Sequence, residues 1–205
     1  MTSTAPRGYA KGRATRRQIL DEAMTLFGEM GYRSASLREI AARCGISHPG
    51  LLHHFPSKEA LLGAVLERRD ALDAERFPSG GSGTDQLQTL VDVVEHNAHV
   101  PGIVELFAAL STEAVAPDHP AHGYFVGRYA RTRAELAASL EVTRAQGVLR
   151  DAVDPALAAV VIIAVMDGLQ VQWLLDRESV DMARALRDHI AGLLTVPFPA
   201  RVQVS

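Results

Sequence analysis

Several features are scarce or missing in this 205-residue chain, and each absence excludes a class of protein. One cysteine, Cys44, excludes an intrachain disulfide framework and fits a reducing, cytoplasmic setting. The longest uninterrupted apolar run, residues 156–166, is about half of what a bilayer-spanning helix needs. The N-terminus is polar and carries arginine, so we expect neither a secretory signal nor a membrane anchor.

Motifs of catalysis are also missing from the sequence. There is no Gly-rich phosphate loop, no G-x-S-x-G and no H-E-x-x-H. Strand signals are weak throughout, whereas apolar residues recur at helical spacing along the chain. We therefore predict an all-α protein with about nine helices that is not an enzyme and holds no cofactor.

A net positive charge is missing as well, since the formal net charge is −3. Its distribution is uneven, however. Residues 1–58 hold nine Lys or Arg and four Asp or Glu, a net charge of +5, and the remainder carries −8. Because neutralising phosphates requires local positive charge, this split favours nucleic-acid binding by the N-terminal part.

The most informative stretch, SLREIAARCGISHPGLLHHFPSKE, occupies residues 36–59. Ser36 and Glu39 form a capping box that starts a helix, and Gly45 suits the left-handed conformation that ends it. Ser47 caps a second helix. Two helices joined by a short Gly-containing turn predict a helix-turn-helix, whose second helix fits the major groove of DNA.

This stretch resembles the DNA-binding core of the tetracycline-repressor (TetR-type) family of bacterial regulators. The matching motifs, in chain order, are Ile40-Ala41, Gly45, Ile46-Ser47, His54-Phe55 and the SKEALL segment at 57–62. Residues 19–32 also resemble the family's first helix, and Gly31 is expected to end that helix. Residues 1–10 lack periodicity and are expected to form a flexible tail. The resemblance implies an N-terminal three-helix DNA-binding domain, here residues 1–56, and a helical ligand-binding and dimerisation domain, residues 57–205, with 58–77 as a connecting helix.

By the same resemblance, the recognition helix runs from about His48 to His54, and its first residues face the base edges. His48 and Pro49 would read bases, and Arg38 would reach into the groove from the preceding helix. The residues expected to contact DNA are Ser36, Arg38, Ser47, His48, Pro49, Gly50, His53, His54 and Lys58.

Two positions depart from the family pattern. Members often carry Thr or Ser where this chain has Gly50, and most carry Tyr where it has Leu52. Leucine cannot donate the phenolic hydrogen bond to phosphate. We expect this to remove about 1–2 kcal/mol of the interaction free energy that positions the protein on DNA. Phosphate anchoring is therefore expected from Lys58 and the adjacent His53 and His54.

The resemblance implies a homodimer on a palindromic operator and release of DNA when a small molecule binds. The two C-terminal helices, expected at about 156–175 and 180–194, are the candidate dimer surface, and the first is apolar on nearly all sides. The expected ligand-binding residues are Val94, Asn97, Phe107, Phe125, Met166, Gln170 and Trp173, and Glu113 and Asp167 are further polar candidates. We expect a repressor, although these residues do not distinguish repression from activation.

Two alternatives remain open at the level of sequence. His96, His99, His119 and His122 form two pairs at i,i+3, which suits two imidazoles on one helix face. If the pairs met, they would hold a transition metal and make the protein a metal sensor. The second alternative is a helical interaction adaptor that has lost DNA binding, suggested by Leu52 and the net acidity.

Overall fold

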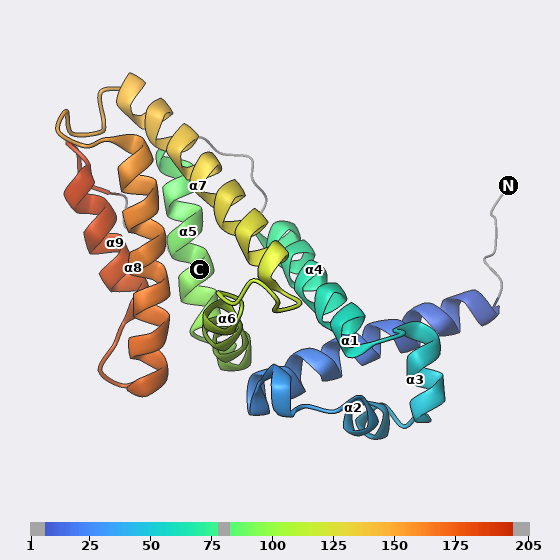
Figure 1. Cartoon of the computed structure of the whole chain (residues 1–205). Coiled ribbons are helices and arrows are strands. Elements are labelled where there is room, and N and C mark those ends of the chain that lie inside the picture. Colours follow the sequence, from blue (N-terminus) through green and yellow to red (C-terminus); the bar gives the residue numbers. More distant parts are fainter. Residues whose placement is uncertain (1–6, 78–82, 199–205) are drawn as a thin grey trace, which may run out of the picture. The chain divides into compact units, whose positions relative to one another are not determined.

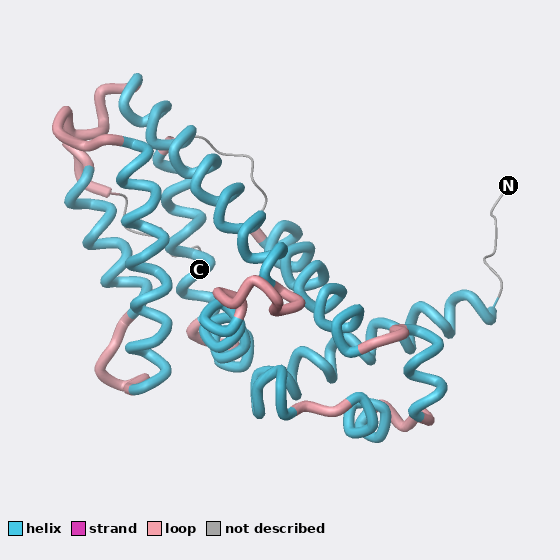
Figure 2. Tube along the Cα trace, viewed as in Figure 1, coloured by secondary structure: helices cyan, strands magenta, loops and turns pink. Residues whose placement is uncertain are grey.

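The computed structural model describes residues 7–77 and 83–198. These residues form nine α-helices and no strand, joined by short loops (Figures 1 and 2). The helices are α1 (Arg7–Ser34), α2 (Leu37–Arg43), α3 (His48–His54), α4 (Lys58–Arg76), α5 (Thr84–Asn97), α6 (Pro101–Glu113), α7 (His122–Ala145), α8 (Pro155–Leu175) and α9 (Met182–Leu193). The predicted all-α fold with about nine helices is confirmed.

Local sequence signals account for most helix ends. Gly45 and Gly147 adopt φ of 65° and 72°, the left-handed conformation that a terminating glycine tolerates. At the start of α8, the carboxylate of Asp154 accepts a hydrogen bond from the backbone N–H of Leu157 at 2.8 Å. Pro155 then occupies the first turn of the helix, where its missing N–H has no helical partner.

The start of α1 differs from the prediction. Residues 7–10 were expected to belong to a flexible tail, but α1 begins at Arg7. The error arose because this segment lacks an apolar period, the signal on which the prediction depended. At the other end of α1, Gly31 has φ 78° and ψ 157°, which interrupts the helix at the residue where the sequence predicted its end.

The chain divides into two compact units, residues 1–72 with 105–124, and residues 73–104 with 125–205. The boundary predicted after residue 56 separates a DNA-binding part from a regulatory part and does not coincide with the division into compact units. It stays a prediction. In the first unit, helices α1 to α4 share a core of fully buried apolar side chains. Its members include Ile19, Leu26, Phe27, Ile40, Leu51, Phe55, Leu61, Leu62 and Val65.

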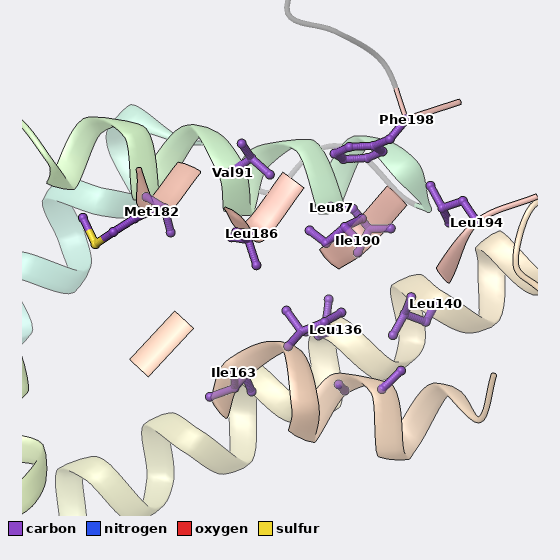
Figure 3. Close-up of a cluster of buried hydrophobic side chains, with 14 of the residues drawn as sticks. Leu87, Val91, Leu136, Leu140, Ile163, Met182, Leu186, Ile190, Leu194 and Phe198 are labelled. Carbon is purple, nitrogen blue, oxygen red and sulfur yellow. The ribbon is translucent and has the colours of Figure 1, made fainter. Parts of the chain in front are cut away.

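The second unit has its own core, built by α5, α7, α8 and α9. Figure 3 shows side chains of these four helices pointing toward one another, among them Leu87, Leu140, Ile163 and Leu186. α9 packs against both α5 and α8. The backbone after α7 also pairs with the end of α9, through an isolated bridge between Leu149 and Leu194.

α8 is the most apolar helix, and its 21 residues are long and apolar enough to cross a membrane by length and composition alone. This length was not expected from the sequence, because the longest uninterrupted apolar run, residues 156–166, is about half of a membrane-spanning length. One face of α8, including Ala159 and Ile162, is buried in the core of the second unit. That packing explains the apolar residues of this face, whereas the opposite face also carries apolar residues that stay exposed.

Candidate nucleic-acid interface

Both helices of the helix-turn-helix begin at a serine whose side chain caps the helix. The hydroxyl Oγ of Ser36 accepts the backbone N–H of Glu39 at 3.2 Å at the start of α2. Oγ of Ser47 accepts the backbone N–H of Gly50 at 3.1 Å at the start of α3. The recognition helix therefore has the bounds that the sequence predicted, His48–His54, and its N-terminal turn is held by a side chain rather than by the core.

The residues expected to read bases lie on the surface of this motif. Arg38 and Pro49 are exposed and His48 is half-buried. Within the described residues Arg38 forms no ion pair, so its guanidinium is available for a groove contact. On the buried face of α3, Leu51 is 0% exposed and anchors the helix in the core.

Gly50 fits tightly against the cap of its own helix. A Cβ at this position would lie 3.2 Å from Oγ of Ser47, closer than most carbon contacts. A larger residue here, such as the hydroxyl-bearing residues usual in the family, requires the cap to move by a few tenths of an ångström. Glycine therefore allows the hydrogen bond from its own N–H to Oγ of Ser47 without a steric conflict. It has no side chain that could contact DNA.

The adjacent histidines at the end of α3 lie in different surroundings. His53 is exposed and His54 is half-buried, with their rings 5.7 Å apart in a T-shaped arrangement. Phe55, 2% exposed, ends the helix and belongs to the core. Nearby, burial raises the pKa of the Cys44 thiol, so this cysteine is an inert core residue rather than a reactive one.

Lys58 lies at the first position of α4, as predicted, but its ammonium turns back toward α1. Nζ donates to the carbonyl oxygen of Arg33 at 3.0 Å and lies 4.6 Å from the ring centroid of Tyr32. Burial lowers the pKa of Lys58, and burial together with Glu59 raises the pKa of Tyr32 to about 12. This lysine therefore links the end of α1 to the start of α4. A phosphate contact by the same ammonium would compete with these interactions.

Other basic residues of the first unit are divided between carboxylate partners and solvent. Arg43 binds Glu29 at 2.8 Å and lies 3.7 Å from Glu39, and Arg68 binds Asp21 at 2.9 Å. By contrast, the guanidinium of Arg16 lies 4.6 Å over the ring of Phe55, beside the end of α3. The sequence placed Arg16 in the basic N-terminal part, but only the tertiary structure could show its contact with Phe55.

The residues expected to bind a ligand do not all lie in one unit. Phe107 belongs to the first unit, and the other six belong to the second. Val94, Asn97, Phe125 and Trp173 are buried, while Met166 and Gln170 are half-buried. Whether they share one pocket stays a prediction.

A polar pair lies among the ligand candidates of the second unit. The hydroxyl of Tyr129 on α7 donates to Oδ2 of Asp167 on α8 at 2.7 Å. Burial raises the pKa of Asp167, and the Tyr129 hydrogen bond and Arg128 partly offset that effect. The ring of Phe125 lies 6.3 Å from that of Tyr129. Sequence reasoning named Asp167 but missed Tyr129, because no sequence pattern pairs residues 38 positions apart.

The histidine pairs have other partners. His119 is buried, accepts the N–H of Ala121 on Nδ1 at 3.2 Å, and places Nε2 3.5 Å from Glu113. Nδ1 of His96 lies 3.1 Å from Arg76. No group of three or more potential ligands that could hold a metal occurs in residues 7–77 and 83–198. Nothing in the described part of the chain supports the metal-sensor alternative.

The capped α2–turn–α3 motif, with its exposed polar face, defines a helix-turn-helix DNA-binding protein. Comparison with known proteins narrows the class. Residues 19–65 match the model of bacterial regulatory proteins of the tetR family, and residues 114–195 match that of the BetI-type transcriptional repressor C-terminal domain. The chain belongs to the TetR family of bacterial transcriptional regulators.

Three similar proteins illustrate the family relationship. The HTH-type transcriptional regulator UidR of Escherichia coli strain K12 is 29% identical over 192 residues, which cover 88% of this chain and 93% of UidR. A putative transcriptional regulator from Saccharomonospora viridis, solved with choline, is 25% identical with a TM-score of 0.76, covering 90% of this chain and all of that one. Salmonella enterica GusR is 26% identical with a TM-score of 0.68, covering 89% and 96%.

Proposed function

We propose that this regulator binds a two-fold symmetric operator as a homodimer, represses transcription from it in the cytoplasm, and leaves it when a small molecule binds. The observation that carries the proposal is the helix-turn-helix. Its recognition helix has a side-chain cap, a buried anchor at Leu51, and His48 and Pro49 in its first turn. Arg38 is exposed on the preceding helix. Arg recognises guanine through two hydrogen bonds, and an apolar side chain contacts the thymine methyl.

The exposed face of α8 supports dimerisation. Leu157, Val160, Val161, Val171 and Leu175 are large apolar residues with exposed fractions from 39% to 82%. Their spacing, continued by Ala164 and Gly168, places them on one stripe of the helix. A Cβ added at Gly168 would meet no atom within 4 Å in the single chain, so this glycine leaves room for close approach of a second helix. A stripe of this size exposed to water favours a second copy of α8 as its cover.

For the effector, we propose a small molecule that is bound by the second unit and carries a positive charge. The half-buried carboxylate of Asp167, with the rings of Phe125 and Tyr129 close by, offers the two groups that attract a cation. The structural relative solved with choline supports this assignment. The other ligand candidates, Val94, Asn97, Phe107, Met166, Gln170 and Trp173, stay predictions.

Selection of bound DNA from a random library tests the central proposal. The enriched sequences should contain two inverted half-sites whose centres lie about 34–36 Å apart, or a multiple of that distance. Affinity for the enriched site should fall steeply as salt rises. Enrichment of no sequence, or of sites without two-fold symmetry, would contradict the proposal and favour the interaction-adaptor alternative.

Titration of the protein–operator complex with choline tests the effector class. Choline should weaken operator binding, while its neutral isostere 3,3-dimethylbutan-1-ol should not, because the two molecules differ mainly in charge. Asp167→Asn should remove the difference. Equal binding of choline to free and operator-bound protein would rule out its role as a releasing effector, since only differential affinity shifts an equilibrium.

A further inference from the structure

The first turns of α1 lie outside the part of the chain that matches the family. The tetR-family match begins at residue 19, whereas α1 begins at Arg7. Residues 7–18, which we call the α1 extension, contain five basic residues and no Asp or Glu. Those residues are Arg7, Lys11, Arg13, Arg16 and Arg17.

Burial in the core does not explain why residues 11–18 are so basic. None of residues 11–18 is buried, and Lys11, Arg13, Arg16 and Arg17 are exposed. Basic residues without any Asp or Glu give this segment a local positive charge. A polyanion placed along the segment would be attracted by that charge.

The position of the α1 extension identifies the polyanion. Arg16 stacks over Phe55 with its guanidinium carbon 4.6 Å from the ring centroid, and Phe55 ends the recognition helix. In Figure 1 the blue end of α1 projects past α3. The α1 extension therefore lies against the C-terminal end of the recognition helix, in the same unit as the residues expected to read DNA. A helix of twelve residues is about 18 Å long, which matches the spacing of about five phosphates along one DNA strand.

We propose that the α1 extension is a second DNA-contacting element, which binds the sugar-phosphate backbone beside each half-site and adds affinity without sequence preference. This inference rests on the proposed operator-binding function. In it, Arg16 positions the extension against α3, and Lys11, Arg13 and Arg17 supply charge to the phosphates. The occupant is duplex DNA that flanks the operator rather than the operator bases themselves.

The test compares wild type with the double variant Lys11→Gln/Arg17→Gln on the selected operator and on a scrambled duplex. A dimer of this variant loses up to four phosphate contacts, so the slope of log K against log salt should become shallower by about four. Affinity at 0.1 M salt should fall tenfold or more for both duplexes, with an unchanged ratio between them. Lengthening the operator by six random base pairs on each side should strengthen wild-type binding but not binding by the variant.

The matched control is Arg131→Gln/Arg133→Gln, which removes the same charge from exposed positions on α7. Both double variants should keep the wild-type circular dichroism spectrum and melting temperature. A salt slope and affinity equal to wild type would overturn the inference, as would a changed ratio between operator and scrambled duplex, because the extension would then read bases. Either result leaves the proposed function intact, because that function fails only if wild type selects no sequence or selects sites without two-fold symmetry.

Discussion

At the scale of single residues, the helix-turn-helix separates residues that hold the motif from residues that face outward. Ser36 and Ser47 do the first, since their hydroxyls accept backbone N–H groups at helix starts. Arg38 does the second, since it is exposed and forms no ion pair within the described residues. Lys58 was predicted to contact phosphate, yet its ammonium binds the carbonyl of Arg33. The two kinds of residue call for different measurements.

Replacement of Arg38 tests base reading. Arg38→Ala should relax the operator preference at one position of each half-site, with a loss of about 1–3 kcal/mol of discrimination, because a two-hydrogen-bond contact to guanine is removed. Repeating the DNA selection with the variant measures this. A uniform loss of affinity across all sequences would assign Arg38 to the phosphates instead.

Ser47 is predicted both to cap α3 and to contact phosphate, and two substitutions separate these roles. Ser47→Ala should lower the free energy of unfolding by about 1 kcal/mol, whereas Ser47→Gly should lower it by only a few tenths, because glycine is tolerated at a cap. Both should weaken DNA binding if the hydroxyl also reaches a phosphate. Denaturant melts paired with binding titrations distinguish the roles, and wild-type affinity in the glycine variant would leave Ser47 as a cap alone.

At the scale of elements, the helices were predicted well where local chemistry ends them and less well where it does not. The recognition helix has the predicted bounds because Ser47 caps its start and Phe55 ends it in the core. The start of α1 was missed because a basic, unpacked helix has no apolar period. α8 was recognised as apolar from its sequence, but which of its faces is covered depends on α5, α7 and α9.

The uncovered face of α8 yields a prediction about assembly. Val171→Glu should dissociate the dimer, because it places a charge in the apolar stripe, where an unpaired charge is costly to bury. Operator binding should weaken as well, since a monomer cannot bind both half-sites at once. Sedimentation velocity across a concentration series measures the change. Val126→Glu on α7 is the control, since Val126 is similarly exposed at 56% against 50%. A dimeric Val171→Glu protein would place the interface elsewhere.

At the scale of the whole molecule, folding stability should depend on the ionisation of Asp167. Burial raises the pKa of this carboxyl above the ordinary 3.8, so between 3.8 and the raised value the folded state binds more protons than the unfolded state. The free energy of unfolding contributed by this group therefore falls as pH rises through that window. Above the window, the folded state carries a half-buried charge.

Asp167→Asn should abolish this contribution. The amide oxygen still accepts the Tyr129 hydroxyl, so the variant should be more stable than wild type at pH 7, and the difference should shrink as pH falls toward 4. Thermal melts from pH 4.5 to 8 measure it. A variant that is less stable than wild type at pH 7 would mean that the ionised carboxylate is stabilised by its neighbours, with Arg128 the first candidate.

The sequence by itself determined the class of the protein. A capping box, further N-terminal caps and terminating glycines are local chemistry, in which each residue acts on backbone groups a few positions away. These signals can therefore be recognised along the chain. The charge division between residues 1–58 and the remainder is likewise a property of sequence. Together these features predict the helix-turn-helix, the resemblance to its family and most helix ends.

The tertiary structure decided which side chains are available. It turned Lys58 toward Tyr32, placed Arg16 over Phe55, joined Tyr129 to Asp167 and left one stripe of α8 exposed. Each of these contacts joins residues that are distant in sequence, or depends on which face of a helix the core has already covered. Such contacts are set by packing between elements, and no periodicity or motif within one element encodes them.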